Sequence, residues 1–85
     1  MRLGNVMREK SPRIVVTFAT TSDAMAMEAA AREHGIPGRI IPVPSEIDAG
    51  CGLSWCADLT DKQELESSLD ELALAFEGMH VVLMY

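Results

Sequence analysis

Both cysteines of this 85-residue chain lie in one short stretch, DAGCGLSWCAD at residues 48–58. Cys51 stands between Gly50 and Gly52. The thiolate is the reactive form of cysteine, and its attack on another sulfur atom needs an unobstructed approach. Flanking glycines have no side chain to block that approach, and they permit turns that aim backbone N–H groups at an anion. The stretch predicts a reactive, exposed thiol at Cys51; the alternative is a glycine turn in which the cysteine is incidental.

Cys56 follows five residues later in a window of apolar and small residues. Free cysteine is among the most buried residue types, so we expect Cys56 to be a core thiol. The alternative is that Cys56 is a secondary site residue, a resolving cysteine that forms a disulfide with Cys51. Such a bridge needs α-carbons within about 7 Å, and an extended chain separates the two by more than that, so it would require a turn or bulge.

No metal ion is expected. The other candidate ligands besides the two cysteines are His34 and His80, and no C-x-x-C or H-x₃-H spacing joins any of them. His34 suits the C-terminal end of a helix, where the helix dipole favours a cation. No glycine-rich phosphate loop is present either, so we expect no cofactor.

The charge is unevenly distributed and excludes some classes of partner. The net charge is −6, yet residues 1–13 hold four basic side chains against one acid, and the rest of the chain holds three against twelve. A body this acidic repels phosphate backbones, so we expect no nucleic-acid binding. No apolar run approaches the ~20 residues of a membrane span, and the N-terminus lacks the apolar core of a signal peptide. We expect a cytoplasmic protein with reduced thiols and no membrane association.

The pattern of apolar residues predicts four strands, at 13–19, 38–43, 53–58 and 79–85, and two helices, at 22–34 and 61–77. Thr21 or Ser22 is expected to cap the first helix, and Gly35 to end it. A capping box of Thr60 and Gln63 is expected to begin the second, whose apolar stripe runs to Phe76. Residues 1–12 are expected to be a flexible basic lead before one domain at 13–85.

The order β-α-β-β-α-β predicts an α+β, ferredoxin-like sandwich, in which a four-stranded antiparallel sheet carries two helices on one face. Pro42 cannot donate a ladder hydrogen bond, which favours an edge position for its strand. Because the strands carry apolar residues on both faces and the helices cover one, the other face is expected to bury a second copy, giving a homodimer. Trp55 is expected in the core, with the alternative that it walls the thiol site.

From residue 14 onward the sequence resembles the DUF3343 family of selenium/sulfur carrier-like proteins. The resemblance lies in VVTFATTSDAMAMEAAAREHGIPGRIIPVPSEIDAGCGL, above all in GIP-x-R-x-IPVP and in CGL after SEIDAG. It implies that Cys51 is the carrier thiol, framed by Gly50 and Gly52. Members often carry a basic residue near position 56, where this chain has Cys56, and the basic lead resembles an addition to the family domain.

The resemblance and the thiol together predict a sulfur or selenium carrier that holds a persulfide or perselenide on Cys51. Such a protein carries a substrate more than it catalyses a reaction, so whether it is an enzyme is left open. Its expected partners are a cysteine desulfurase-like donor and a downstream acceptor protein. The alternative is a small-molecule-sensing or regulatory ferredoxin-like module without thiol chemistry, which rests on analogy of fold alone. A plain interaction subunit is the third reading.

Overall fold

A computed structural model describes residues 11–47 and 51–84. The elements in chain order are β1 (Ser11–Thr17), α2 (Thr21–His34), β2 (Arg39–Pro42), β3 (Leu53–Asp58), the 3-10 turn η1 (Leu59–Asp61), α3 (Lys62–Glu71) and β4 (Gly78–Met84). This is the predicted β-α-β-β-α-β order. The first strand begins two residues earlier than predicted.

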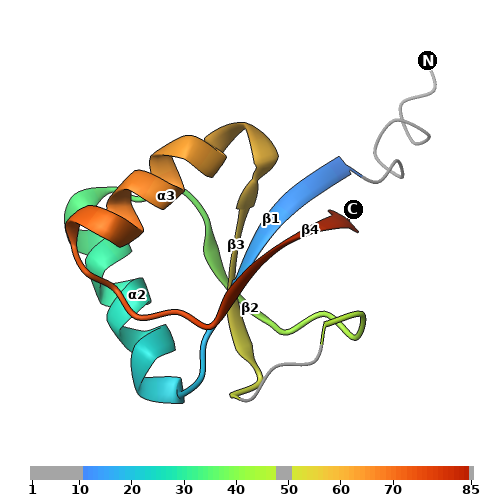
Figure 1. The fold of residues 1–85 in the computed structure, drawn as a ribbon, viewed down its shortest axis with the longest axis horizontal. Helices are drawn as coiled ribbons and strands as arrows, with labels where there is room; N and C mark the ends of the chain where they lie inside the picture. The colour runs from blue at the N-terminus through green and yellow to red at the C-terminus, as the bar shows by residue number, and fades with distance from the viewer. Residues whose placement is uncertain (1–10, 48–50, 85) are drawn as a thin grey trace.

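The four strands form one sheet in the order β2-β3-β1-β4, with every neighbouring pair antiparallel. Both helices pack on the same side of this sheet (Figure 1). The architecture is therefore α+β and ferredoxin-like, as predicted. The proline-containing strand β2 lies at one edge, where a missing ladder N–H does no harm. β4 forms the other edge.

α2 begins and ends on local signals, with a small shift from the prediction. Thr20, and not Thr21 or Ser22, caps it: its Oγ1 accepts a hydrogen bond of 3.1 Å from the Asp23 amide. This satisfies one of the amides left unpaired in the first turn. Gly35 ends the helix as predicted, with a left-handed φ of 71° and its N–H donating to the Ala31 carbonyl at 2.8 Å.

α3 is shorter than predicted because the chain reverses at Ala73. This residue has φ of 51°, in the left-handed region. The Ala73 amide donates to the Asp70 carbonyl at 3.2 Å and the Leu74 amide to the Leu69 carbonyl at 3.0 Å. These two bonds make a Schellman C-cap, with alanine where glycine is usual. The predicted helix to residue 77 was therefore wrong.

Both ends of the second helix, α3, differ from the prediction because of the local backbone conformation there. Phe76 lies beyond the helix end and is 44% exposed, so it does not extend the apolar stripe. At the other end, η1 occupies residues 59–61, and the helix N-cap, Asp61, makes no side-chain capping bond. The predicted capping box of Thr60 and Gln63 does not form because Thr60 lies inside the 3-10 turn.

The two faces of the sheet bury separate apolar clusters. The larger cluster lies under the helices and includes Ile14, Val16, Phe18 and Met27. Trp55 belongs to it, 3% exposed, with its Nε1 donating to the Pro37 carbonyl at 2.8 Å, so it is a core residue.

The smaller cluster, on the face away from the helices, consists of Val15, Cys56 and Val82. Ile47, from the loop after β2, packs against it together with Ile41 and Met84. All three residues of the cluster are less than 9% exposed. Part of this face is thus covered within the chain, and the expected second copy on it stays a prediction.

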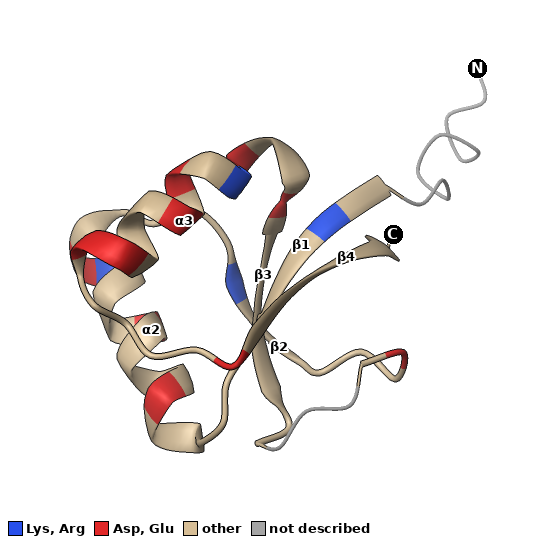
Figure 2. Ribbon diagram, in the orientation of Figure 1, with Lys and Arg blue, Asp and Glu red and all other residues tan. Residues whose placement is uncertain are grey.

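Charged side chains are concentrated away from the β4 edge. Acidic residues occur along both helices, and β4 carries no charged Lys, Arg, Asp or Glu at all (Figure 2). Two of the large apolar side chains that remain exposed lie on this strand, Val81 and Leu83. The other two in the described residues, Met25 on α2 and Phe76 after α3, are less exposed, and none of the four lies on the open face.

Candidate functional site: the Cys51 thiol

Cys51 lies near the end of the β2–β3 connection, two residues before β3 begins at Leu53. The connection is closed by a hydrogen bond of 3.0 Å from the Val43 amide to the Gly52 carbonyl. Gly52 has φ of 82°, a left-handed conformation that side-chain-bearing residues rarely adopt. A Cβ built on Gly52 would meet no atom within 4 Å. The glycine is thus required by the backbone turn and not by crowding around it.

The Cys51 sulfur contacts the backbone of Leu53. The Leu53 N–H donates to Sγ at 3.4 Å, and the thiol donates to the Leu53 carbonyl, also at 3.4 Å. The turn at Gly52 brings both groups to the sulfur, since it reverses the chain between the two residues. The sulfur therefore has one backbone donor and one backbone acceptor beside it, both from Leu53.

Cys51 is half-buried, since its side chain packs against the edge of the cluster under the helices while part of it stays exposed. It is less open than the sequence predicted. Gly50, the other predicted neighbour, lies outside the described residues.

Cys56 is buried in the small cluster on the opposite face, 6% exposed, as predicted. Burial raises the pKa of the Cys56 thiol above its ordinary value of 9.0. The nearby Arg13 and Arg39 guanidinium groups lower that pKa, and Asp58 raises it, but burial dominates. Arg13 is itself paired with Asp58 at 2.7 Å. Cys56 is therefore held as a protonated thiol.

The sheet separates the two cysteines. Cys51 packs with the cluster under the helices, and Cys56 belongs to the cluster on the other face. Side chains of a strand alternate between the two faces of the sheet, so Cys56 points to the face opposite to that of Leu53 and Trp55. A disulfide would have to join side chains from opposite faces, so the structure does not assemble the dithiol pair.

The two histidines lie apart from the thiols. His34 is in the last turn of α2, as expected, and is exposed; His80 is exposed on β4, opposite Val15 of β1. Across residues 11–47 and 51–84, no group of three or more His, Cys, Asp or Glu side chains is placed to hold a metal ion. No helix of this described part is long and apolar enough to cross a bilayer.

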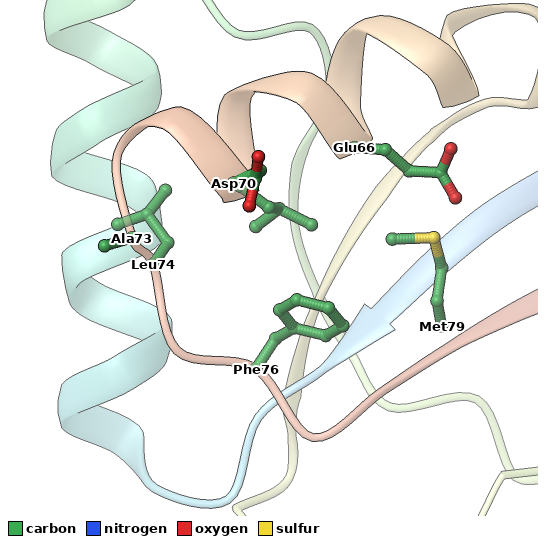
Figure 3. Close-up of a pocket in the computed structure, with 7 residues that line it drawn as sticks. Glu66, Asp70, Ala73, Leu74, Phe76 and Met79 are labelled. Carbon is green, nitrogen blue, oxygen red and sulfur yellow. The ribbon is translucent and has the colours of Figure 1, made fainter.

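A hollow of about 640 Å³ lies between α3 and β4, and sequence reasoning did not find it. Its lining includes the apolar side chains of Leu69, Leu74, Phe76 and Met79, together with Glu66, Asp70 and Ala73, most of them labelled in Figure 3. Neither cysteine lines it. The left-handed turn at Ala73 contributes to its lining, and no residue type in the sequence signals that turn.

Comparison with known proteins gives one result. No curated protein and no solved structure matches the chain significantly. The sequence does match the family described as "Putative Se/S carrier protein-like" over residues 13–81, which is more than half of the chain. This match covers both helices, β2 and β3 in full and most of β1 and β4, and it includes both cysteines. The chain therefore belongs to the DUF3343 family of Se/S carrier-like proteins.

Proposed function

We propose that the protein is a sulfur or selenium carrier in which Cys51 holds the transferred atom. The Cys51 thiolate attacks the terminal sulfur of a donor persulfide, R–S–SH. The donor S–S bond breaks, a new S–S bond forms to Cys51, and the donor leaves as the thiolate R–S⁻. The product is Cys51–S–SH, and no external oxidant or reductant is consumed. The same exchange with R–S–SeH places selenium on Cys51.

The observation that carries the proposal is the contrast between the two thiols. Cys51 lies at the sheet's end, partly exposed, with the Leu53 N–H at 3.4 Å from its sulfur. Cys56 is buried and held protonated on the other face. A donor persulfide can reach a partly exposed thiol, whereas it cannot reach a buried one. A single exposed thiol is sufficient for carriage, because the second cysteine of the reaction belongs to the partner.

The partners follow from the chemistry. Loading needs a donor that presents a persulfide or perselenide, as a cysteine desulfurase does, and unloading needs an acceptor protein with a thiolate of its own. Both steps need reduced thiols, and therefore a reducing compartment such as the cytoplasm. The protein lowers no barrier of its own in this scheme, so it is a substrate carrier rather than an enzyme.

Intact mass spectrometry tests loading. The purified protein is incubated with a small-molecule persulfide, freed from excess donor and analysed under non-reducing conditions. We expect a gain of about 32 Da, one sulfur atom, removed again by dithiothreitol. Cys51→Ser should not gain this mass, and Cys56→Ser, the matched control, should gain it as the natural protein does. Loading of Cys51→Ser, or no loading of the natural protein, would contradict the proposal.

The hollow beside α3 supports a second candidate, the binding of a small apolar molecule without thiol chemistry. Its walls are apolar and its volume suits a ligand of drug-like size. A ligand that binds only the folded protein raises its thermal unfolding temperature. A metabolite that produces such a rise in the natural protein, and a smaller one after Phe76→Ala, would favour this function. Unchanged unfolding across a metabolite library would count against it.

A further inference from the structure

The edge strand β4 is long, apolar and uncharged. It covers Gly78–Met84, seven residues, and its only ionisable side chain is that of His80. Val81 and Leu83 are 56% and 58% exposed. Natural sheets protect an exposed edge with charged residues, proline, bulges or a short strand, because its unpaired backbone groups attract another strand. β4 contains no Lys, Arg, Asp or Glu and no proline, and it is not short: it is one of the two longest strands of the sheet.

The exposed side chains share one face of β4 because of the sheet register. Val81 pairs with Ile14 and Leu83 with Pro12, so both face the side on which the helices lie. Toward the end of the strand the helices no longer cover that side, as the projecting ends of β1 and β4 show in Figure 1. Pro12, opposite Leu83, is exposed as well. This β4 strip, formed by Pro12, Val81 and Leu83, therefore offers apolar side chains next to a backbone edge that no strand of residues 11–47 and 51–84 pairs with.

The strand is complementary to itself. If two copies of β4 pair antiparallel about Val81, Val81 meets Val81 of the second copy and Leu83 meets Met79. On the other face His80 meets Val82, and Met84 meets Gly78. Every pair on the helix side is then apolar, and no two like charges stand opposite each other, which is the arrangement that stabilises cross-strand pairs.

The β4 strip differs from the rest of the surface in charge. Two chains of net charge −6 repel each other over most of their surface, and acidic residues cover both helices. The uncharged β4 edge is a place where two copies can approach closely without opposing carboxylates on the pairing strands. An unrelated partner of opposite charge would instead select one of the acidic surfaces.

We propose that a second copy of this chain pairs with the β4 edge, joining two four-stranded sheets into one eight-stranded sheet. The pairing is isologous, with its two-fold axis at Val81. It does not depend on sulfur carriage. β1 lies between β4 and β3, so both thiols stay outside the interface, and the partly exposed Cys51 keeps its exposure. The homodimer thus forms at the sheet's edge rather than on its open face.

Engineered cysteines test the register. In a Cys51→Ser background, Val81→Cys places two thiols directly opposite each other, within the roughly 7 Å between α-carbons that a disulfide allows. Leu83→Cys is the matched control, because it is equally exposed but would stand about 13 Å from its own copy. We expect mild oxidation to link the Val81→Cys protein into a covalent dimer and to leave the Leu83→Cys protein largely unlinked.

Light scattering on the full chain tests the assembly itself. The natural protein should elute with twice the monomer mass, and Val81→Lys should elute as a monomer with an unchanged circular dichroism spectrum, since the side chain is exposed. Met25→Lys, an exposed apolar position on α2, should remain a dimer. The proposal is overturned if the natural protein is a monomer. This holds also if the monomer covers the β4 edge with its own first ten residues. It is equally overturned by a dimer that survives Val81→Lys, or by equal linking of the two engineered cysteines.

Discussion

Replacing Gly52 by alanine separates two roles of a glycine beside a reactive thiol: reversing the chain, and holding the Leu53 N–H near the sulfur. Gly52 has φ of 82°, and a Cβ there would meet no atom within 4 Å, so the substitution adds backbone strain without a clash. A left-handed conformation costs an alanine roughly 1–2 kcal/mol, and reduced freedom of the unfolded chain offsets part of that loss. The expected fall in the free energy of unfolding is therefore about 1 kcal/mol.

Gly35→Ala is a close control for this substitution. Gly35 has φ of 71°, also has no atom within 4 Å of a built Cβ, and lies at the end of α2. Both variants should lower the urea midpoint by a similar amount with an unchanged slope. Only Gly52→Ala should also slow the reaction of Cys51 with a persulfide, because relief of strain at residue 52 moves the Leu53 N–H away from the sulfur.

The rate of Cys51 loading decides the outcome. Gly52→Asn should recover part of the rate, since asparagine tolerates the left-handed region better than other non-glycine residues. If Gly52→Ala and Gly35→Ala lose the same stability and load Cys51 equally fast, the turn serves only the chain reversal. The reasoning that connects Gly52 to thiol chemistry would then be refuted.

Three further outcomes follow from the described contacts. Alkylation of the native protein should label Cys51 and reach Cys56 only after unfolding; equal labelling in the folded state would instead favour a dithiol mechanism. Because burial raises the pKa of Cys56, the folded state holds that proton more tightly than the unfolded chain, so the free energy of unfolding should fall as pH rises above about 9. In urea titrations at several pH values, Cys56→Ala should lack this part of the fall, and an identical pH dependence would contradict the assignment. Ala73→Gly should raise the free energy of unfolding by up to about 1 kcal/mol, because glycine removes the cost of the left-handed φ; a lower urea midpoint would show that the cost is absent.

Sequence patterns predicted the fold because its signals are local. Alternating apolar residues predict each strand, and Gly35 predicts the end of the first helix. With right-handed crossovers, the order of elements then leaves few topologies. The edge position of β2 followed from Pro42 alone. The end of α3 could not be predicted in the same way, since Ala73 adopts a conformation that its residue type does not favour.

The candidate site was predictable in its residues but not in its contacts. The glycines around Cys51 indicated a turn. The alternation of side chains along β3 placed Cys56 and Trp55 on opposite faces of the sheet. The contact between the Cys51 sulfur and Leu53 depends on the loop conformation, which alternation and capping signals do not specify. The packing of Ile47 against the cluster that contains Cys56 likewise depends on the path of a ten-residue connection. The alternation of side chains along the strands therefore could not show that a loop covers part of the open face.

Discharge of a loaded Cys51 tests the carrier account most directly, because a carrier must give up the atom that it accepts. The protein is loaded with isotopically labelled sulfur, separated from the donor and mixed with an acceptor carrying a single reactive thiol. The account predicts that Cys51 loses about 32 Da while the acceptor gains the labelled atom, and that no such transfer occurs with Cys51→Ser. A labelled persulfide that remains on Cys51 in the presence of excess acceptor thiolate would contradict it.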